Sequence, residues 1–182
     1  SLTCDFPGNI YTTGSFAGTA DFDPGVATQN FSSGGYSDIF VSKLNSSGNY
    51  VWAKHFNGTT NANFGLGIQV DVSGNVFTSG SFFGTVDFDP NTSIFSLVAP
   101  GSLAPNCFIS KLDQNGNFVW AKQFTGSSGC AGTALCIDAS TNVFITGYFF
   151  GTIDFDRNHT IAHKTRTTKN GNCATDRRTK KQ

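Results

Sequence analysis

The segment Gly-Thr-apolar-Asp-Phe-Asp occurs three times in this chain of 182 residues, as "GTADFD" from residue 18, "GTVDFD" from 84 and "GTIDFD" from 151. Three further aspartates and three glycines keep the same step of 66 and then 67 residues: Asp5, Asp71 and Asp138, and Gly14, Gly80 and Gly147. A fixed period of this length indicates supersecondary units that bury their faces against their neighbours. The chain is therefore a tandem array of small units.

The repeats divide the chain into four parts. We assign them as one repeat at residues 1–66, a second at 67–133, part of a third at 134–156, and a divergent tail at 157–182. The net charge of zero conceals an asymmetry, because residues 1–156 hold 11 Asp and 4 Lys, whereas the tail holds 8 Lys or Arg and one Asp.

Each repeat has the pattern of β-strands joined by tight turns. "FVSKLNSSGNYVWAKHF" at 40–56 returns as "FISKLDQNGNFVWAKQF" at 108–124, and the Gly-Asn turns between apolar runs are typical of hairpins. Residues 1–156 show no helical period, and 19 Phe with no Met is the composition of packed sheets. Four strands in about 67 residues predict a propeller blade.

The predicted fold class is therefore all-β: four-stranded antiparallel β-propeller blades, two of them full and one partial, in an incomplete propeller. Closed propellers have about four to eight blades, and terminal repeats expose apolar faces unless these are capped. We therefore expect residues 1–182 alone to be unstable or to self-associate through open blade faces.

Each full repeat has its motifs in one order: a first strand that ends in Asp, a Gly-Asn turn, the Gly-Thr-apolar-Asp-Phe-Asp segment, "SKL", and a second Gly-Asn turn before "VWAK". This order resembles the SBBP β-propeller repeat family and, more loosely, NHL-type blades. The resemblance covers residues 1 to about 156, and it implies a secreted or cell-surface bacterial protein, part of a longer chain, with no catalytic residues to transfer. Thr141 departs from the pattern, because it stands where the other copies have Gly8 and Gly74, which predicts a weaker third hairpin. The pattern stops after Asp156.

The strand alternation assigns different roles to the aromatic and acidic residues of the repeated segment. Phe22, Phe88 and Phe155 fall on the face with the apolar neighbours, so we expect them to pack on their blades. Trp52 and Trp120 occupy matching places in the fourth strands. They fit core packing between blades, or a platform on which a sugar could stack.

The aspartate pairs of the repeated segment are the candidate metal site: Asp21 and Asp23, Asp87 and Asp89, and Asp154 and Asp156. They lie in the connection between the second and third strands, which we expect on the same rim as the connections between blades. Two carboxylates at i and i+2 can bind calcium together with backbone carbonyls. Alternatively, they accept turn N–H groups and stay solvated, or they bind a basic partner.

No catalytic motif stands out, so no cofactor is expected apart from this calcium. His55 aligns with Gln123, which favours a surface position in a strand. We expect a non-enzymatic extracellular binding or adhesion module that takes a protein or glycan through its rim loops. A glycan-active enzyme of propeller type and a structural spacer remain alternatives. No 18-residue apolar run that could span a membrane is present.

The cysteines and the tail give weaker signals. Cys4 and Cys136 lie in strand-like apolar runs, where a small buried thiol is favoured over a disulfide. The basic tail fits an arm that binds polyanions, a divergent end, or out-of-frame translation, which we favour because the break falls within a repeat. Nucleic acid is disfavoured as a partner, because no aromatic platform accompanies the basic residues.

Overall fold

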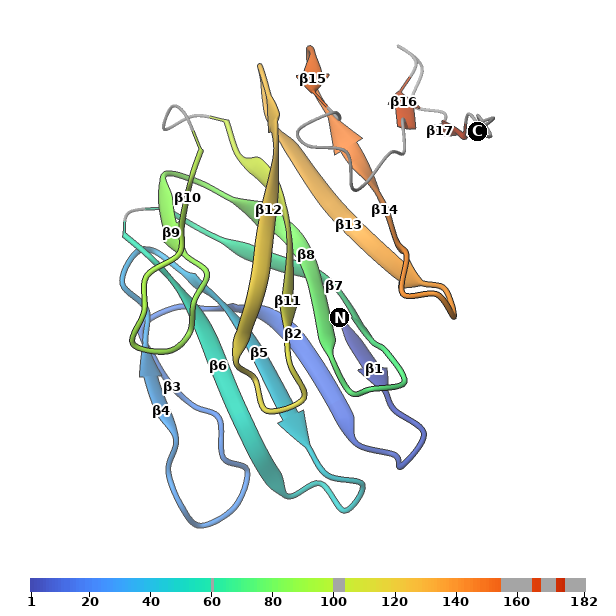
Figure 1. The fold of residues 1–182 in the computed structure, drawn as a ribbon. Coiled ribbons are helices and arrows are strands. Elements are labelled where there is room, and N and C mark those ends of the chain that lie inside the picture. The colour runs from blue at the N-terminus through green and yellow to red at the C-terminus, as the bar shows by residue number, and fades with distance from the viewer. Residues whose placement is uncertain (60, 100–103, 155–164, 168–172, 176–182) are drawn as a thin grey trace.

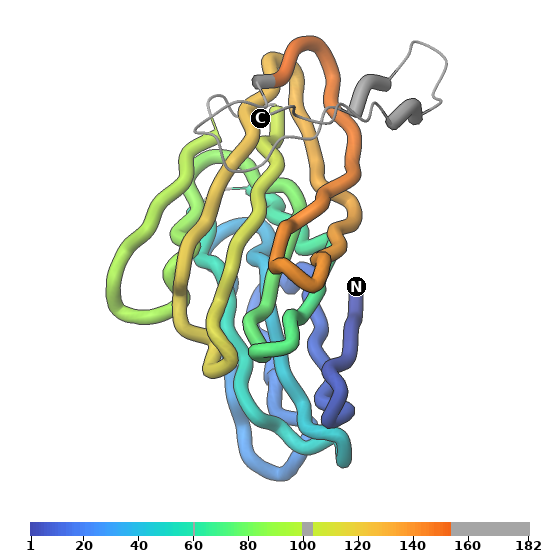
Figure 2. The backbone as a smooth tube through the Cα atoms, turned by 45° about the vertical axis from the view of Figure 1, so that its right-hand side comes forward, coloured from blue at the N-terminus to red at the C-terminus, as the bar shows by residue number. Residues whose placement is uncertain are grey.

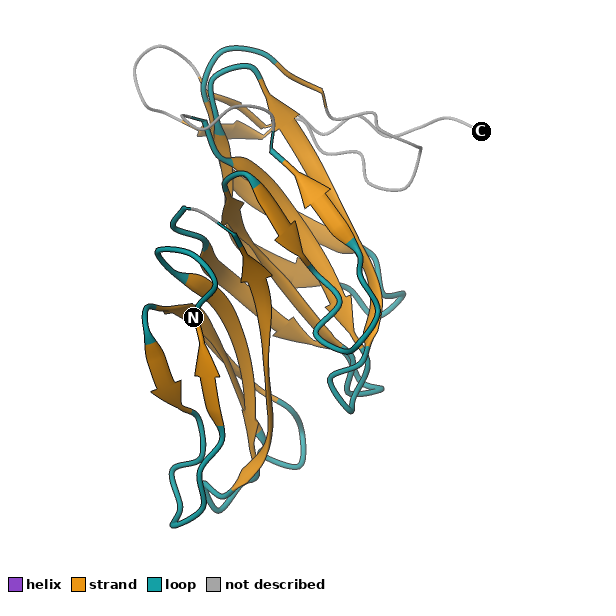
Figure 3. Cartoon of the chain, turned by 90° about the vertical axis from the view of Figure 1, so that its left-hand side faces the viewer, coloured by secondary structure: helices purple, strands orange, loops and turns teal. Residues whose placement is uncertain are grey.

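The computed structural model describes residues 1–59, 61–99, 104–154, 165–167 and 173–175. Every regular element in these residues is a β-strand, as Figure 3 shows. The strands form antiparallel sheets with the arrangement of blades, so the predicted all-β class is confirmed.

Two four-stranded units follow each other along the chain (Figure 1). The first blade consists of β1 (Leu2–Cys4), β2 (Ile10–Phe16), β5 (Asp38–Leu44) and β6 (Tyr50–Gly58). The second blade consists of β7 (Phe64–Val70), β8 (Val76–Phe82), β11 (Asn106–Leu112) and β12 (Phe118–Gly126). A third repeat contributes the hairpin of β13 (Cys130–Ile137) and β14 (Val143–Phe149).

The first and second repeats also insert a short hairpin between their second and third strands. In the first blade it is β3 (Thr19–Asp21) with β4 (Asn30–Ser32), and in the second it is β9 (Thr85–Asp87) with β10 (Ser96–Val98). In the third repeat, β15 (Ile153–Asp154) occupies the corresponding place.

The predicted repeat boundaries do not coincide with the ends of strands. The divisions at 66/67 and 133/134 fall inside β7 and β13, because the first strands begin several residues ahead of the aspartates that set the repeat phase. The predicted tail, 157–182, lies outside the described residues except for β16 (Thr165–Thr167) and β17 (Cys173–Thr175), which pair with each other.

Pairing across repeats joins the inserted hairpins to the preceding blade. β9 of the second blade pairs with the last strand of the first, so that Asp87 lies opposite Asn57 and Val86 opposite Gly58. In the same way β15 pairs with β12, with Ile153 opposite Gly126. Each later repeat therefore extends the sheet of the repeat before it, and the blades are joined by backbone hydrogen bonds as well as by packed faces.

The repeated aspartates Asp5, Asp71 and Asp138 hold the hairpin turns. Oδ1 of Asp71 accepts the backbone N–H groups of Ser73 and Asn75, both at 2.9 Å, and Oδ2 accepts the side-chain amide of Asn75 at 2.8 Å. Asn142 and Asp138 make the corresponding bonds in the third repeat. Thr141 occupies the Gly position there with a φ of 63°, a strained region for a β-branched residue. The turn forms with the shared hydrogen bonds despite that strain.

The main core lies between the first and second blades. The first blade contributes Tyr11, Val41, Trp52 and Phe56, and the second packs its fully buried phenylalanines against them. Trp52 is buried, and its Nε1–H donates to the carbonyl oxygen of Gln114 in a turn of the second blade, at 3.1 Å. The matching tryptophan, Trp120, is half-buried and packs edge-on against Phe77. Both tryptophans thus contribute to packing.

His55 lies half-buried in the aromatic cluster of the first blade and is not the surface residue that the alignment with Gln123 predicted. Its ring centroid is 4.6 Å from that of Phe31 and 6.0 Å from that of Phe16. Burial lowers the pKa of His55, and the nearby charge of Asp38 opposes this to a lesser extent.

This lowered pKa predicts a loss of stability on mild acidification. Because the unfolded chain takes up a proton near pH 6.5 and the folded chain resists it, the free energy of unfolding should fall as the pH drops from about 7.5 to 5.5. His55→Gln, which copies the residue at position 123, should flatten this dependence. Urea titrations at several pH values measure it, and equal slopes for both proteins would contradict the burial of His55.

The four cysteines whose side chains are described are free thiols, but their burial differs from the prediction. Cys4 and Cys136 are exposed, whereas Cys107 and Cys130 are buried. The two thiols lie on opposite faces of their repeats, because Cys4 pairs with Ile10, whereas Cys136 pairs with Phe144 and is one register position away from the counterpart of Cys4. Neither face is covered at these positions, which an apolar run alone does not reveal.

This placement predicts two classes of thiol reactivity. In a Cys173→Ser background, Ellman's reagent should modify Cys4 and Cys136 within the mixing time of a manual assay. Cys107 and Cys130 should react only in denaturant, because a thiol without solvent access and without thiolate character is inert. Peptide mapping after a short exposure identifies the modified residues, and early labelling of Cys107 would show that the second and third repeats are not packed as described.

Candidate interaction surface

Two loops of identical length project from the inserted hairpins, and we call them the clamped loops, residues 21–29 and 87–95. Oδ1 of Asp21 accepts the N–H of Asp23 at 3.0 Å and that of Gln29 at 2.8 Å. Oδ1 of Asp87 bonds to Asp89 and Phe95 in the same way, at 3.0 and 2.9 Å. One carboxylate thus fixes both ends of each loop.

The second aspartate of each pair holds the next turn. Oδ1 of Asp23 accepts the N–H of Gly25 at 2.7 Å, and Oδ1 of Asp89 accepts the N–H of Asn91 at 3.0 Å. The N–H bonds from Asp23 and then Gln29 lower the pKa of Asp21, because they stabilise its charged form. The aspartate pairs therefore act in the described loops as acceptors that shape the backbone.

The phenylalanines between the aspartates anchor the loops to different degrees. Phe88 is fully buried between the blades, whereas Phe22 is half-buried on the first blade. Backbone bonds add to the anchoring: the N–H of Phe22 donates to Gln29 and that of Phe88 donates to Phe95. Phe155 and Asp156 lie outside the described residues, and Asp154 is described only as part of strand β15.

The clamped loops start at the rim that joins successive blades, but they do not stay there. β9 runs antiparallel to β6, and Lys54 Nζ donates to Asn91 Oδ1 at 3.2 Å, several residues before β6 ends. The loop therefore folds back along the outer edge of the first blade, and Figure 2 shows both loops projecting outside the body of strands. The sequence prediction of an acidic band on that rim did not include this fold-back, which sequence spacing alone does not reveal.

The tips of the clamped loops are exposed and differ in sequence. Val26 is 108% exposed in the first loop, and Ile94 is 80% exposed in the second. The first tip reads "PGVAT" and the second "PNTSI". Loops that vary in sequence on a fixed backbone frame are typical of binding surfaces. Sequence reasoning missed these two residues, although a comparison of the copies shows variable tips within a shared Asp-Phe-Asp-Pro start.

In the part of the chain that the structure describes, no three His, Cys, Asp or Glu side chains gather as a metal site would require. Calcium binding to the aspartate pairs stays a prediction from the sequence. Because one oxygen of each described carboxylate already accepts backbone N–H groups, the geometry favours the turn-shaping role.

We therefore expect the same melting temperature in millimolar calcium and in chelator. Differential scanning calorimetry of the whole chain measures this. A rise in calcium that disappears in the double variant Asp87→Asn, Asp89→Asn would instead support calcium, since one carboxylate alone gives a hard cation too few ligands.

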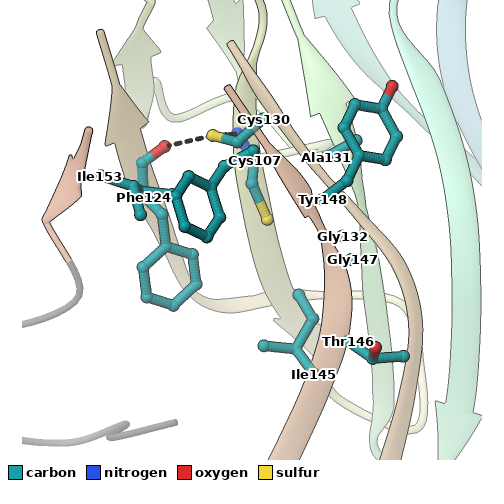
Figure 4. A pocket seen from close by; sticks show the side chains of 11 residues that line it. Cys107, Phe124, Cys130, Ala131, Gly132, Ile145, Thr146, Gly147, Tyr148 and Ile153 are labelled. Atoms are coloured by element: carbon teal, nitrogen blue, oxygen red, sulfur yellow. Dashed lines mark hydrogen bonds between the residues drawn. The ribbon is translucent and has the colours of Figure 1, made fainter. Parts of the chain in front are cut away.

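A small cavity of about 40 Å³ lies between the second and third repeats and is lined mainly by apolar groups (Figure 4). The N–H of Cys107 donates to Cys130 Sγ at 3.1 Å, and the Cys130 thiol donates to the carbonyl oxygen of Phe124 at 3.3 Å. Burial raises the pKa of both thiols, well above the usual value for Cys107. Neither thiol is poised as a nucleophile, so the cavity is part of the packing between repeats.

Similarity to a known repeat protein bears on the architecture of the chain. No family model matches it. It is 25% identical over 134 residues to an uncharacterized WD repeat-containing protein of Acanthamoeba polyphaga mimivirus, an alignment that covers 70% of this chain and 10% of that protein. None of the described residues forms a helix long and apolar enough to cross a membrane. Together with the blade-like sheets, the similarity supports a chain of β-propeller-type repeats.

Proposed function

We propose that this chain is a non-enzymatic binding module of propeller type, which holds a protein or glycan with the clamped loops. The observation that supports it most is the pair of loops with one backbone frame and two different exposed tips. A rigid scaffold that carries variable loops is a common basis of recognition.

The finer assignment rests on the sequence motifs. The resemblance to SBBP repeats supports a secreted or cell-surface bacterial protein in which these blades belong to a longer chain. The chain spans about a tenth of the length of its viral relative, which fits a module within a larger protein.

The geometry disfavours the glycan-active enzyme. Paired catalytic carboxylates need environments that separate their pKa values. Here the described acids of the two loops have equivalent partners, and each carboxylate binds backbone N–H groups of its own loop. The structural spacer is a weaker alternative than a binding module, because a spacer gives no reason for two loops that share one hydrogen-bonded frame and differ at their tips.

The test measures binding by the whole chain to a glycan array and to an array of cell-surface proteins. Val26→Ser together with Ile94→Ser should reduce binding at least about tenfold, because both contacts are apolar and central to the tips. The matched control is Val72→Ser, which removes an apolar side chain that is 100% exposed on a hairpin turn outside the clamped loops.

The melting temperatures of all three proteins should agree, because the substituted side chains stand in water. Binding that Val72→Ser lowers as much as the loop double variant would overturn the assignment of the surface. Absence of binding on both arrays would favour the spacer, and turnover of a polysaccharide would favour the enzyme.

A further inference from the structure

The junction between the second and third repeats differs from the junction between the first and second at two facing positions. The strand register matches Cys107 on β11 to Ile39 on β5. It matches Cys130, at the start of β13, to Asn63, which directly precedes β7. A buried cysteine therefore stands on both sides of the later junction and on neither side of the earlier one.

Asn63 shows how the earlier junction is held at this position. Its side chain is 0% exposed, and its amide N–H donates to the carbonyl oxygen of Ser37, just ahead of β5, at 3.1 Å. Its Oδ1 accepts the backbone N–H of Phe83, which follows β8, at 3.0 Å. One amide side chain thus connects the first blade to the second by hydrogen bonds.

Cys130 replaces that amide with hydrogen bonds of sulfur. Its Sγ accepts the N–H of Cys107 at 3.1 Å, and its thiol donates to the carbonyl oxygen of Phe124 at 3.3 Å. Sulfur is a weak donor and a weak acceptor, so these bonds hold the third repeat less firmly than Asn63 holds the second. A covalent bond between the two cysteines would supply the stronger connection.

The two cysteines are close enough for such a bond after one side-chain rotation. The backbone N of Cys107 is 3.1 Å from Cys130 Sγ, and only Cα and Cβ separate this N from the Cys107 sulfur. Figure 4 shows the two sulfur atoms pointing in different directions, and Cys107 Sγ lies against Gly132. Turning Cys107 to the staggered rotamer on the side of its own N places the two sulfurs next to each other. The small cavity that both residues line gives room for this movement.

We propose that Cys107 and Cys130 form a disulfide that joins the third repeat to the second when the chain folds in an oxidising compartment. The free thiols described above are the reduced form of this pair. Because burial raises the pKa of both thiols in the folded chain, the bond forms while the third repeat docks, before the sulfurs lose contact with solvent. Neither residue belongs to the clamped loops, so the inference does not depend on the proposed function.

The reaction is thiol–disulfide exchange with a small-molecule disulfide such as oxidised glutathione. The thiolate of one cysteine attacks a sulfur of the oxidant and displaces one glutathione thiolate. The thiolate of the other cysteine then attacks the mixed disulfide and displaces the second. The two glutathione thiolates take up the protons that the cysteines released, so the chain loses two hydrogen atoms and the oxidant is reduced to two thiols.

The experiment measures the equilibrium between this pair and glutathione. The whole chain carries Cys4→Ser, Cys136→Ser and Cys173→Ser, which leaves one possible intramolecular disulfide. Reduced and oxidised chains are each refolded from urea into the same glutathione mixture, so that equilibrium is approached from both sides. The remaining thiols are blocked with N-ethylmaleimide in urea, and the intact mass gives the linked fraction.

The equilibrium constant for the bond should be at least about tenfold higher in the refolded chain than in the same mixture with urea. The fold holds the two sulfurs near each other, whereas the unfolded chain must close a loop to bring them together. In the linked protein, the backbone amides of β13 and β14 should also exchange at least about tenfold more slowly than in the reduced protein. Equal constants with and without urea, or faster exchange in the linked protein, would overturn the proposal.

A matched variant moves one cysteine along the same strand. Cys130→Ala with Thr133→Cys places the second thiol at an exposed position of β13, where the Thr133 hydroxyl donates to the carbonyl oxygen of Thr146 on β14. The loop to Cys107 has nearly the same length, so the unfolded chains should agree. The refolded variant should show no preference for the bond. A preference as strong as that of Cys107 with Cys130 would mean that the facing positions are not what favours it.

Discussion

Phe88→Ala is expected to lower the free energy of unfolding by about 3–5 kcal/mol, because it leaves a cavity between two blades. The Phe88 ring is fully buried and lies 4.9 Å from that of Phe108, 5.0 Å from Phe56 and 5.4 Å from Phe82, measured between centroids. Since these partners come from both blades, the cavity cannot close by the movement of one side chain. Urea unfolding followed by tryptophan fluorescence measures the loss.

The matched control for this prediction is Phe22→Ala. Phe22 occupies the same place in the first repeat but is only half-buried, so its removal exposes less new surface and should cost less than half as much. If Phe88→Ala is silent, or if both variants lose the same stability, the packing of the Asp-Phe-Asp segment between blades is wrong.

Gly80→Ala is expected to destabilise the chain by at least about 3 kcal/mol, at or beyond the upper end of ordinary overpacking. Gly80 lies in β8, directly opposite β7, and a Cβ at this position would overlap the carbonyl oxygen of Phe64. The backbone of β7 cannot move away from β8 here without breaking the hydrogen bonds that pair the two strands. Thermal unfolding by circular dichroism and soluble yield both report the effect.

Gly14→Ala provides the comparison, because a Cβ there meets only the ring of Phe40, at 2.8 Å. That ring is half-buried and can rotate or shift, so the variant should lose clearly less stability than Gly80→Ala. Equal losses at the two glycines would mean that the close approach of Phe64 to β8 is not a property of the folded protein.

The all-β blade fold was predictable because two signals agree. The step of 66 and 67 residues defines the unit, and the alternation in segments such as "FVSKL" and "YVWAKHF" defines strands within it. Tight turns supply the remaining information, since a Gly with positive φ at Gly48 or Gly116 fixes the hairpin between the third and fourth strands.

The pairing of β9 with β6 was not predictable from the same signals. A strand of three residues has too few positions for alternation to identify its partner, and the partner belongs to the previous repeat. The burial of Cys107 and Cys130 depends on packing between the second and third repeats, whereas Cys4 and Cys136 show that an apolar run alone does not decide which face is covered.

The candidate site was predicted in position but not in detail. Sequence spacing singled out Asp21, Asp23, Asp87 and Asp89, which do form the frame of the clamped loops. The spacing did not distinguish a carboxylate that accepts hydrogen bonds from backbone N–H groups of its own loop from one that binds a ligand. Both roles favour two aspartates that are two residues apart. The distinction requires the position of the N–H groups, which only the folded loop provides.

The pairing of the second repeat's inserted hairpin with the first blade has a consequence for synthesis on the ribosome. β6 ends at Gly58, but the strand that pairs with the end of its outer edge begins only at Thr85. While the intervening residues are still being made, a nascent first blade presents a bare strand edge, the kind of surface that recruits other chains. Slow translation between these two points should therefore favour aggregation, and the same holds between Gly126 and Ile153, where β12 waits for β15.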